Sequence, residues 1–143
     1  MKHCLIASTL AFIVLATGIN TQACTLAVTG ISFGQFVVGD GNGSTATASI
    51  TVNCQNGIPY NIGLDSGLNA SRTMKNGAAN LPYELYRDLI GNIWGDDGIS
   101  VPSPSVAGVG NDMDQTHTVY GTLGGDLLLE GVYTDTITVT LDY

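Results

Sequence analysis

The C-terminal stretch, residues 133–143, constrains the fold of this chain more than any other part of the sequence. Its side chains alternate between two kinds, as in a strand whose successive side chains point to opposite faces. One set is apolar beyond its second member and comprises Tyr133, Asp135, Ile137, Val139, Leu141 and Tyr143. The other set comprises Thr134, Thr136, Thr138, Thr140 and Asp142. Because threonine suits the pleat and tolerates water, we predict a long strand with one face on a core and one in solvent.

This predicted strand ends flush with the carboxyl terminus at Tyr143. A strand carries backbone N–H and C=O groups along both edges, and each edge is either paired with a neighbour or left exposed. Which strand lies beside residues 133–143 is therefore the functional question that the sequence raises.

The N-terminus has the pattern of a secretory signal peptide. A short start containing Lys2 precedes an apolar run over residues 5–16, which is too short to span a membrane. Thr21 and Ala23 are small residues at the −3 and −1 positions of a cleavage site. We therefore predict a signal peptide over residues 1–23.

Cleavage at that point leaves a mature domain over residues 24–143 and removes Cys4, so that Cys24 and Cys54 remain. An even pair of cysteines in an exported protein favours a disulfide over a metal or redox site. A bridge between them would contribute about 3–4 kcal/mol to stability in the chain-entropy description. Cleavage after Ala16 and a lipoprotein start at Cys24 are the alternatives to this N-terminus.

Turn signals separate about seven stretches that alternate or read as extended, which is the pattern of a single antiparallel β-sandwich. Pro82 has no N–H to donate to a ladder, so we expect it at a strand start or edge. Residues 95–113 are rich in Gly, Pro and Ser and are expected to form loops. The predicted strands cover residues 24–28, 31–36, 47–54, 60–64, 81–88, 115–123 and 133–143.

Composition and motifs argue against several kinds of function. Four Lys and Arg against twelve Asp and Glu give a net charge of −8, so the chain lacks the basic surface with which proteins bind nucleic acid. The mature domain has one histidine, His117, and no G-x-S-x-G turn, so no hydrolase triad is indicated. Residues 40–44 resemble the opening of a calcium loop, but Thr45 stands where the loop needs glycine. We expect no enzyme, no metal and no cofactor, and we expect Asp96, Asp97, Asp112 and Asp114 to be solvated loop carboxylates.

Several aromatic residues leave one alternative open. They could form a platform on which sugars stack, although such residues more often pack a sandwich core. They are Tyr60, Tyr83, Tyr86, Trp94 and Tyr120.

Six motifs, in the same order along the chain, resemble the spore coat protein U domain, which is shared with subunits of archaic chaperone–usher pili. Any one of them is weak, but together they extend over essentially all of residues 24–143. They are Cys24 with Phe33-Gly34, residues 49–54, residues 81–88, Trp94-Gly95-Asp96, Val119-Tyr120-Gly121 and residues 131–143.

The resemblance implies an immunoglobulin-like sandwich that lacks its last strand and is completed by a donor strand from a partner. The acceptor groove would lie along the C-terminal strand at Tyr133, Ile137, Val139, Leu141 and Tyr143. The implied partners are a periplasmic chaperone, an outer-membrane usher and neighbouring pilus subunits. The protein would be exported to the periplasm and then to the cell surface, as a subunit of a pilus or coat.

One feature departs from the family pattern. Fibre-forming subunits carry a donor strand before their first sandwich strand, whereas a chain beginning at Cys24 has no such extension. We therefore expect a minor or terminal subunit, or a coat protein that does not polymerise. The rival interpretation is a secreted carbohydrate- or surface-binding module that uses Tyr86 and Trp94.

Overall fold

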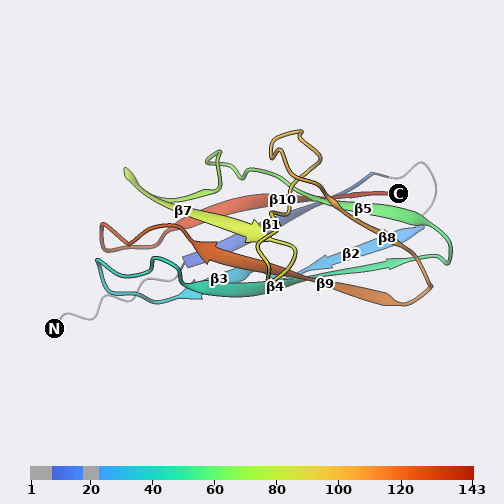
Figure 1. Cartoon of the computed structure of the whole chain (residues 1–143), viewed down its shortest axis with the longest axis horizontal. Helices are drawn as coiled ribbons and strands as arrows, with labels where there is room; N and C mark the ends of the chain where they lie inside the picture. Colours follow the sequence, from blue (N-terminus) through green and yellow to red (C-terminus); the bar gives the residue numbers. More distant parts are fainter. Residues whose placement is uncertain (1–7, 18–22) are drawn as a thin grey trace.

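The computed structural model describes residues 8–17 and 23–143, and every regular element in these residues is a β-strand (Figure 1). The all-β class expected from the alternating pattern is thus confirmed. None of the described residues belongs to a helix that is long and apolar enough to cross a membrane. The strands are β1 (Ser8–Thr17), β2 (Cys24–Val28), β3 (Ile31–Gly34), β4 (Thr45–Cys54), β5 (Pro59–Leu64), β6 (Thr73–Asn76), β7 (Ala79–Tyr86), β8 (Val106–Val109), β9 (Asp114–Leu123) and β10 (Thr134–Asp142).

The strands form one path, β2-β4-β9-β7-β6-β10-β1-β3, with β5 pairing with β10 and β8 pairing with β5. β7 connects the two halves of this path, because residues 79–82 pair with β6 and residues 83–86 pair with β9. A strand that changes partners in this way lets the sheet fold over and enclose a core between its two halves.

Pro82 lies at this change of partners, inside β7, and not at a strand start or edge as expected. The position suits proline because it is where β7 leaves one neighbour for the other, so a missing N–H costs little. The following N–H, that of Tyr83, bonds to the carbonyl of Arg72 at 2.9 Å.

The core is built mainly from the inward-facing positions of β4, β5, β7, β9 and β10, with further buried residues from β1, β2, β3 and β6. In β4 these are Ala48, Ile50, Val52 and Cys54, which alternate with more exposed residues as the sequence predicted. Each fully buried aliphatic side chain contributes about 1.5–3 kcal/mol to the stability of the fold.

One strand lies in a segment that was expected to be loop. β8, within residues 95–113, pairs antiparallel with β5. Its Gly108 lies against the ring of Tyr60, where a Cβ atom would come within 2.2 Å of Cζ. Small residues packed against an aromatic ring give no alternation of polar and apolar side chains, so the strand leaves no signal in the sequence.

Candidate functional site

β10 lies between two strand partners, and its apolar face forms part of the core. The side chains of Tyr133, Ile137, Val139 and Leu141 are fully buried, and Tyr143 packs against the core while partly exposed. On one edge, β10 pairs antiparallel with β5 over residues 139–142 and with β6 at Thr134.

β1 occupies the other edge of β10. The two strands run parallel, and their ladder extends from Thr9 opposite Thr134 to Thr17 opposite Asp142. In Figure 1 the blue β1 runs alongside the red β10. β1 comes from the apolar run that we assigned to the signal peptide, so a domain of residues 24–143 would lack this strand. We call the space that β1 fills, between β10 and β3, the strand groove.

The side chains of β1 are buried in the strand groove to different extents. Leu10 is fully buried and Phe12 packs against the core while partly exposed. Val14 is in phase with both but is 45% exposed. The strand is therefore inserted most deeply at the end near Leu10.

Strand β3 and the turn before it close the deep end of the groove. β3 pairs antiparallel with β1 at Ser8, Thr9 and Leu10. A Cβ atom at Gly30 would lie 2.9 Å from the carbonyl oxygen of Leu10, so glycine permits the close approach of the two backbones.

A buried carboxylate anchors the start of β10. Asp135 is 4% exposed, and its Oδ2 accepts a hydrogen bond of 2.7 Å from the hydroxyl of Tyr83. Its Oδ1 accepts hydrogen bonds from the backbone and the side-chain amide of Asn69, at 3.2 and 3.0 Å. Burial and the neighbouring Asp135 carboxylate raise the pKa of Tyr83, so its hydroxyl stays protonated and keeps donating. This network fixes β10 against β7 at the end where β1 inserts.

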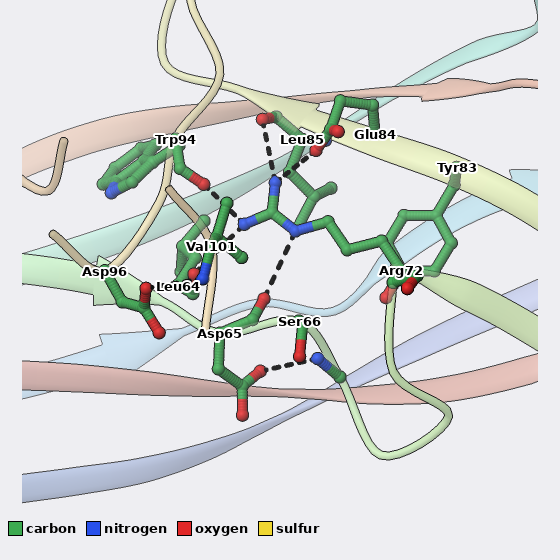
Figure 2. Close-up of polar contacts among 12 residues, drawn as sticks. Leu64, Asp65, Ser66, Arg72, Tyr83, Glu84, Leu85, Trp94, Asp96 and Val101 are labelled. Atoms are coloured by element: carbon green, nitrogen blue, oxygen red, sulfur yellow. Dashed lines mark hydrogen bonds and ion pairs between the residues drawn. The ribbon is translucent and has the colours of Figure 1, made fainter. Parts of the chain in front are cut away.

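Arg72 ties together the loops beside β10 (Figure 2). Its side chain is 3% exposed and forms an ion pair with Glu84 of β7. The guanidinium also donates to the backbone carbonyls of Leu64, Asp65, Leu85 and Trp94. A buried cation with this many acceptors is structural, because it leaves no free donor directed at a ligand.

The remaining candidates from the sequence also have structural surroundings. Cys24 and Cys54 form a disulfide that joins β2 to β4, where the two residues are opposite each other. The Nε2 of His117 is 2.9 Å from the hydroxyl of Tyr60, and its ring lies edge-on to Trp94. Burial lowers the pKa of His117.

A pocket of about 350 Å³ lies over the solvent side of β10 and contains four carboxylates. They are Asp65, Asp96, Asp97 and Asp142. Asp96 differs from the expectation of a solvated carboxylate, since it is 9% exposed. Burial would raise the pKa of Asp96, but hydrogen bonds from Ser100 and Val101 outweigh this and lower it.

The described residues contain no group of three or more His, Cys, Asp or Glu side chains placed to hold a metal ion. The carboxylates of the acidic pocket instead bind donors of their own loops, as Asp97 does with the hydroxyl and N–H of Ser105. Asp65 accepts hydrogen bonds from the N–H of Gly67 in its own loop and from the N–H of Thr138 in β10.

The aromatic residues divide into two groups. Tyr60, Tyr83 and Trp94 are buried, and the indole N–H of Trp94 donates to the carbonyl of Ile62 at 2.8 Å. Tyr86 and Tyr120 lie opposite each other on β7 and β9 and line a pocket of about 410 Å³ with Asp88 and Leu89. Trp94 is therefore a core residue, and only the pair of tyrosines faces a hollow.

These features define an all-β, immunoglobulin-like domain whose distinctive site is a groove for a strand. The chain belongs to the Spore Coat Protein U domain family, whose model matches residues 9–140. The family is structural and not enzymatic, which confirms the expectation that the chain is no enzyme. Among curated proteins, none matches this chain.

A solved structure supports the same fold. The chain is similar to a chain in the crystal structure of the CsuC–CsuE chaperone–tip adhesion subunit pre-assembly complex from the archaic chaperone–usher Csu pili of Acinetobacter baumannii. The two are 18% identical with a TM-score of 0.59, and the match covers 84% of this chain and 40% of that one. This chain thus spans about two fifths of the length of the chain it matches.

Proposed function

We propose that this protein is an exported subunit of a chaperone–usher pilus or coat, and that its sandwich is completed by a strand beside β10. The observation that carries the proposal is the strand groove itself. In residues 24–143 alone, one whole edge of β10 would have no ladder partner, and the core would be open at the site of Leu10 and Phe12. Membership of the Spore Coat Protein U domain family supports this role.

A partner strand in this groove gains stability from two sources. It forms a ladder with the free edge of β10, which is the strand-addition form of recognition. It also buries alternate apolar side chains against Ile137, Val139 and Leu141, each worth about 1.5–3 kcal/mol when fully buried. The partners of this kind are a periplasmic chaperone, which supplies a strand first, and a neighbouring subunit in the assembled fibre.

The subunit is an acceptor. If the leader is removed before Cys24, the mature chain has no strand of its own ahead of β2 to donate. A position at one end of a fibre, or in a coat that does not polymerise, follows from this asymmetry.

Secretion in a periplasm-containing host tests the proposal. We expect a product that starts at Cys24 and is two hydrogens lighter than the reduced chain. With a chaperone of this class co-expressed, it should be recovered as a one-to-one complex. Without the chaperone, it should be recovered in much lower yield. A stable, soluble product that ignores the chaperone would contradict the proposal.

The pocket beside Tyr86 and Tyr120 favours a second candidate function, the binding of a saccharide. Its volume of about 410 Å³ suits a small ligand, and its hydroxyl-bearing rings and threonines offer both stacking and hydrogen bonds. Saturable binding in a glycan screen, lost in Tyr86→Ala and kept in Thr51→Ala on the same sheet, would support it. A screen without saturable binding would remove it.

A further inference from the structure

We infer that the chain carries its own occupant for the strand groove, and that residues 8–17 close the groove until they are removed. The inference rests on the proposed function, because it concerns access to the same groove. Its consequence is that the full-length chain is self-complete, and that a partner strand gains access to β10 only after β1 has left.

The first ground is that β1 and a partner strand would use the same backbone groups. The ladder between β1 and β10 extends from Thr134 to Asp142, the full length of β10. The opposite edge of β10 is already paired with β5 and β6. A ladder position accepts one neighbour on each side, so occupation by β1 and by a partner strand exclude each other.

The second ground is that β1 fills the groove with the side chains that the groove needs. Leu10 is fully buried and lies opposite Ile31 of β3, and Phe12, opposite Ile137 of β10, packs against the same core. Val14 continues the in-phase apolar series opposite Val139, at the less buried end of the strand. The apolar run of the predicted signal peptide therefore also supplies the alternate apolar side chains that the groove requires.

The third ground is the outer side of β1, which differs from that of a permanent surface strand. The outward residues of β10 are threonines, as expected for a strand with one face in water. Between Thr9 and Thr17, those of β1 are Ala11, Ile13 and Leu15, and Ile13 and Leu15 are 50% and 51% exposed. A permanent strand of an exported domain would carry polar residues there, whereas a transient occupant that is itself an export signal would not.

The fourth ground is the way β1 is held. It is bound along β10 by a parallel ladder, which is slightly less stable per residue than an antiparallel one. On its other side only Ser8, Thr9 and Leu10 pair with β3. The strand is therefore fixed at one end and replaceable along the rest.

A binding experiment on the folded full-length chain tests the inference. The protein is produced with the leader retained and oxidised, and a specific protease site is introduced between Thr17 and Cys24. After cutting and removal of the released strand, a fluorescent peptide of residues 8–17 is titrated into cut and intact protein. A peptide carrying Leu10→Asp is the negative control.

We expect the peptide to bind the cut protein in the micromolar range and the intact protein at least about 100-fold more weakly. The tethered strand should compete in the intact chain with an effective concentration in the millimolar range. The peptide carrying Leu10→Asp should bind neither form. Equal binding to cut and intact protein would overturn the inference and leave the proposed function standing. Failure of the peptide to bind either form, with both folded and monomeric, would overturn the inference and the proposed function together.

Variants of the uncut chain give a second readout that does not depend on the peptide. In the full-length protein, Leu10→Asp should lower the melting temperature by about 10 °C, because it buries a carboxylate among apolar groups. Ile13→Asp is the matched control, three residues away on the exposed side, and should change it by less than about 2 °C. Equal effects of the two substitutions would contradict the placement of β1.

Discussion

Arg72 shows how much of this fold depends on one buried charge. Three consecutive residues, Ala70, Ser71 and Arg72, have φ values of 54°, 52° and 49°, in the left-handed region that costs energy for residues with a Cβ. The hydrogen bonds of the guanidinium to four carbonyls and its ion pair with Glu84 offset that cost. The side chain links β5, β7 and the segment at Trp94 through these hydrogen bonds.

Arg72→Leu should therefore lower the free energy of unfolding by about 3–5 kcal/mol, since the buried acceptors lose their donor. The midpoint of a urea titration of the oxidised protein measures this change. Lys75→Leu, at an exposed position on β6, is the control and should shift stability by less than about 0.5 kcal/mol. A loss below 1 kcal/mol in Arg72→Leu would show that water replaces the guanidinium.

His117 gives the domain a pH dependence whose sign follows from its surroundings. Burial lowers its pKa, so the folded state prefers the neutral ring that lies against Tyr60 and Trp94. The stability it contributes is complete above the unfolded pKa of about 6.5 and is lost as pH falls from there to the folded pKa. Asp96 and Asp97 also have lowered pKa values, but their contribution is lost only below about pH 4.

The two windows are separable by experiment. The melting temperature of the unsubstituted protein should fall as the pH drops below about 6.5, and His117→Gln should remove most of that slope while keeping a hydrogen-bonding group near Tyr60. Both proteins should lose stability together below about pH 4. A slope in the upper window that is unchanged by His117→Gln would assign it to another group.

Among the elements, the pair β2–β4 is held by a covalent link. β2 is a five-residue strand at the end of the sheet path, and its Cys24 is bonded to Cys54 at the end of β4. Cys54→Ser should lower the free energy of unfolding by about 2–5 kcal/mol and reduce the yield of exported protein. Thermal unfolding before and after mild reduction gives the same comparison without mutation. Equal stability of the two forms would show that ladder and core alone hold β2.

Alternation predicts an element here wherever a strand has one face in the core. β4, β7, β9 and β10 follow this rule, and Leu81, Tyr83 and Leu85 are buried along β7 as their phase indicates. β8 does not follow it, because glycine is needed at position 108 to leave room for the ring of Tyr60, and not to continue an alternation of polar and apolar side chains. β1 also escapes prediction, since a continuous apolar run carries no period that separates a strand from a signal peptide.

Part of the candidate site could likewise be predicted from the sequence, and part of it could not. The inward residues of β10 could be read from the sequence, and so could the question of what lies beside them. That Asp135 is buried against Tyr83 and Asn69 could not be predicted, because nothing local to the residue distinguishes it from a solvated carboxylate. Its environment comes from β7 and from the loop after β5, which are distant along the chain.

At the scale of the whole molecule, we propose that residues 24–143 form a sandwich with one open edge, at β10. Most of the strands from β2 to β9 pair with other strands of the same range. β10 and β3 are the two strands of this range that pair with β1, so each depends on a strand from the leader or from a partner. Local stability should therefore differ sharply between β10 and the rest of the sheet.

Amide hydrogen exchange of the mature chain, alone and with a bound partner strand, measures this difference directly. In the free chain, the amides of residues 134–142 that bond to β1 should exchange rapidly, and a bound strand should slow them by about 100-fold or more. The amides of β10 that bond to β5 or β6 should be protected in both states. Amides of β4, which are paired on both sides by β2 and β9, should be protected in both states. If the amides of β10 are already as protected as those of β4 in the free chain, and a strand changes nothing, the sandwich is closed and has no open edge for a partner strand.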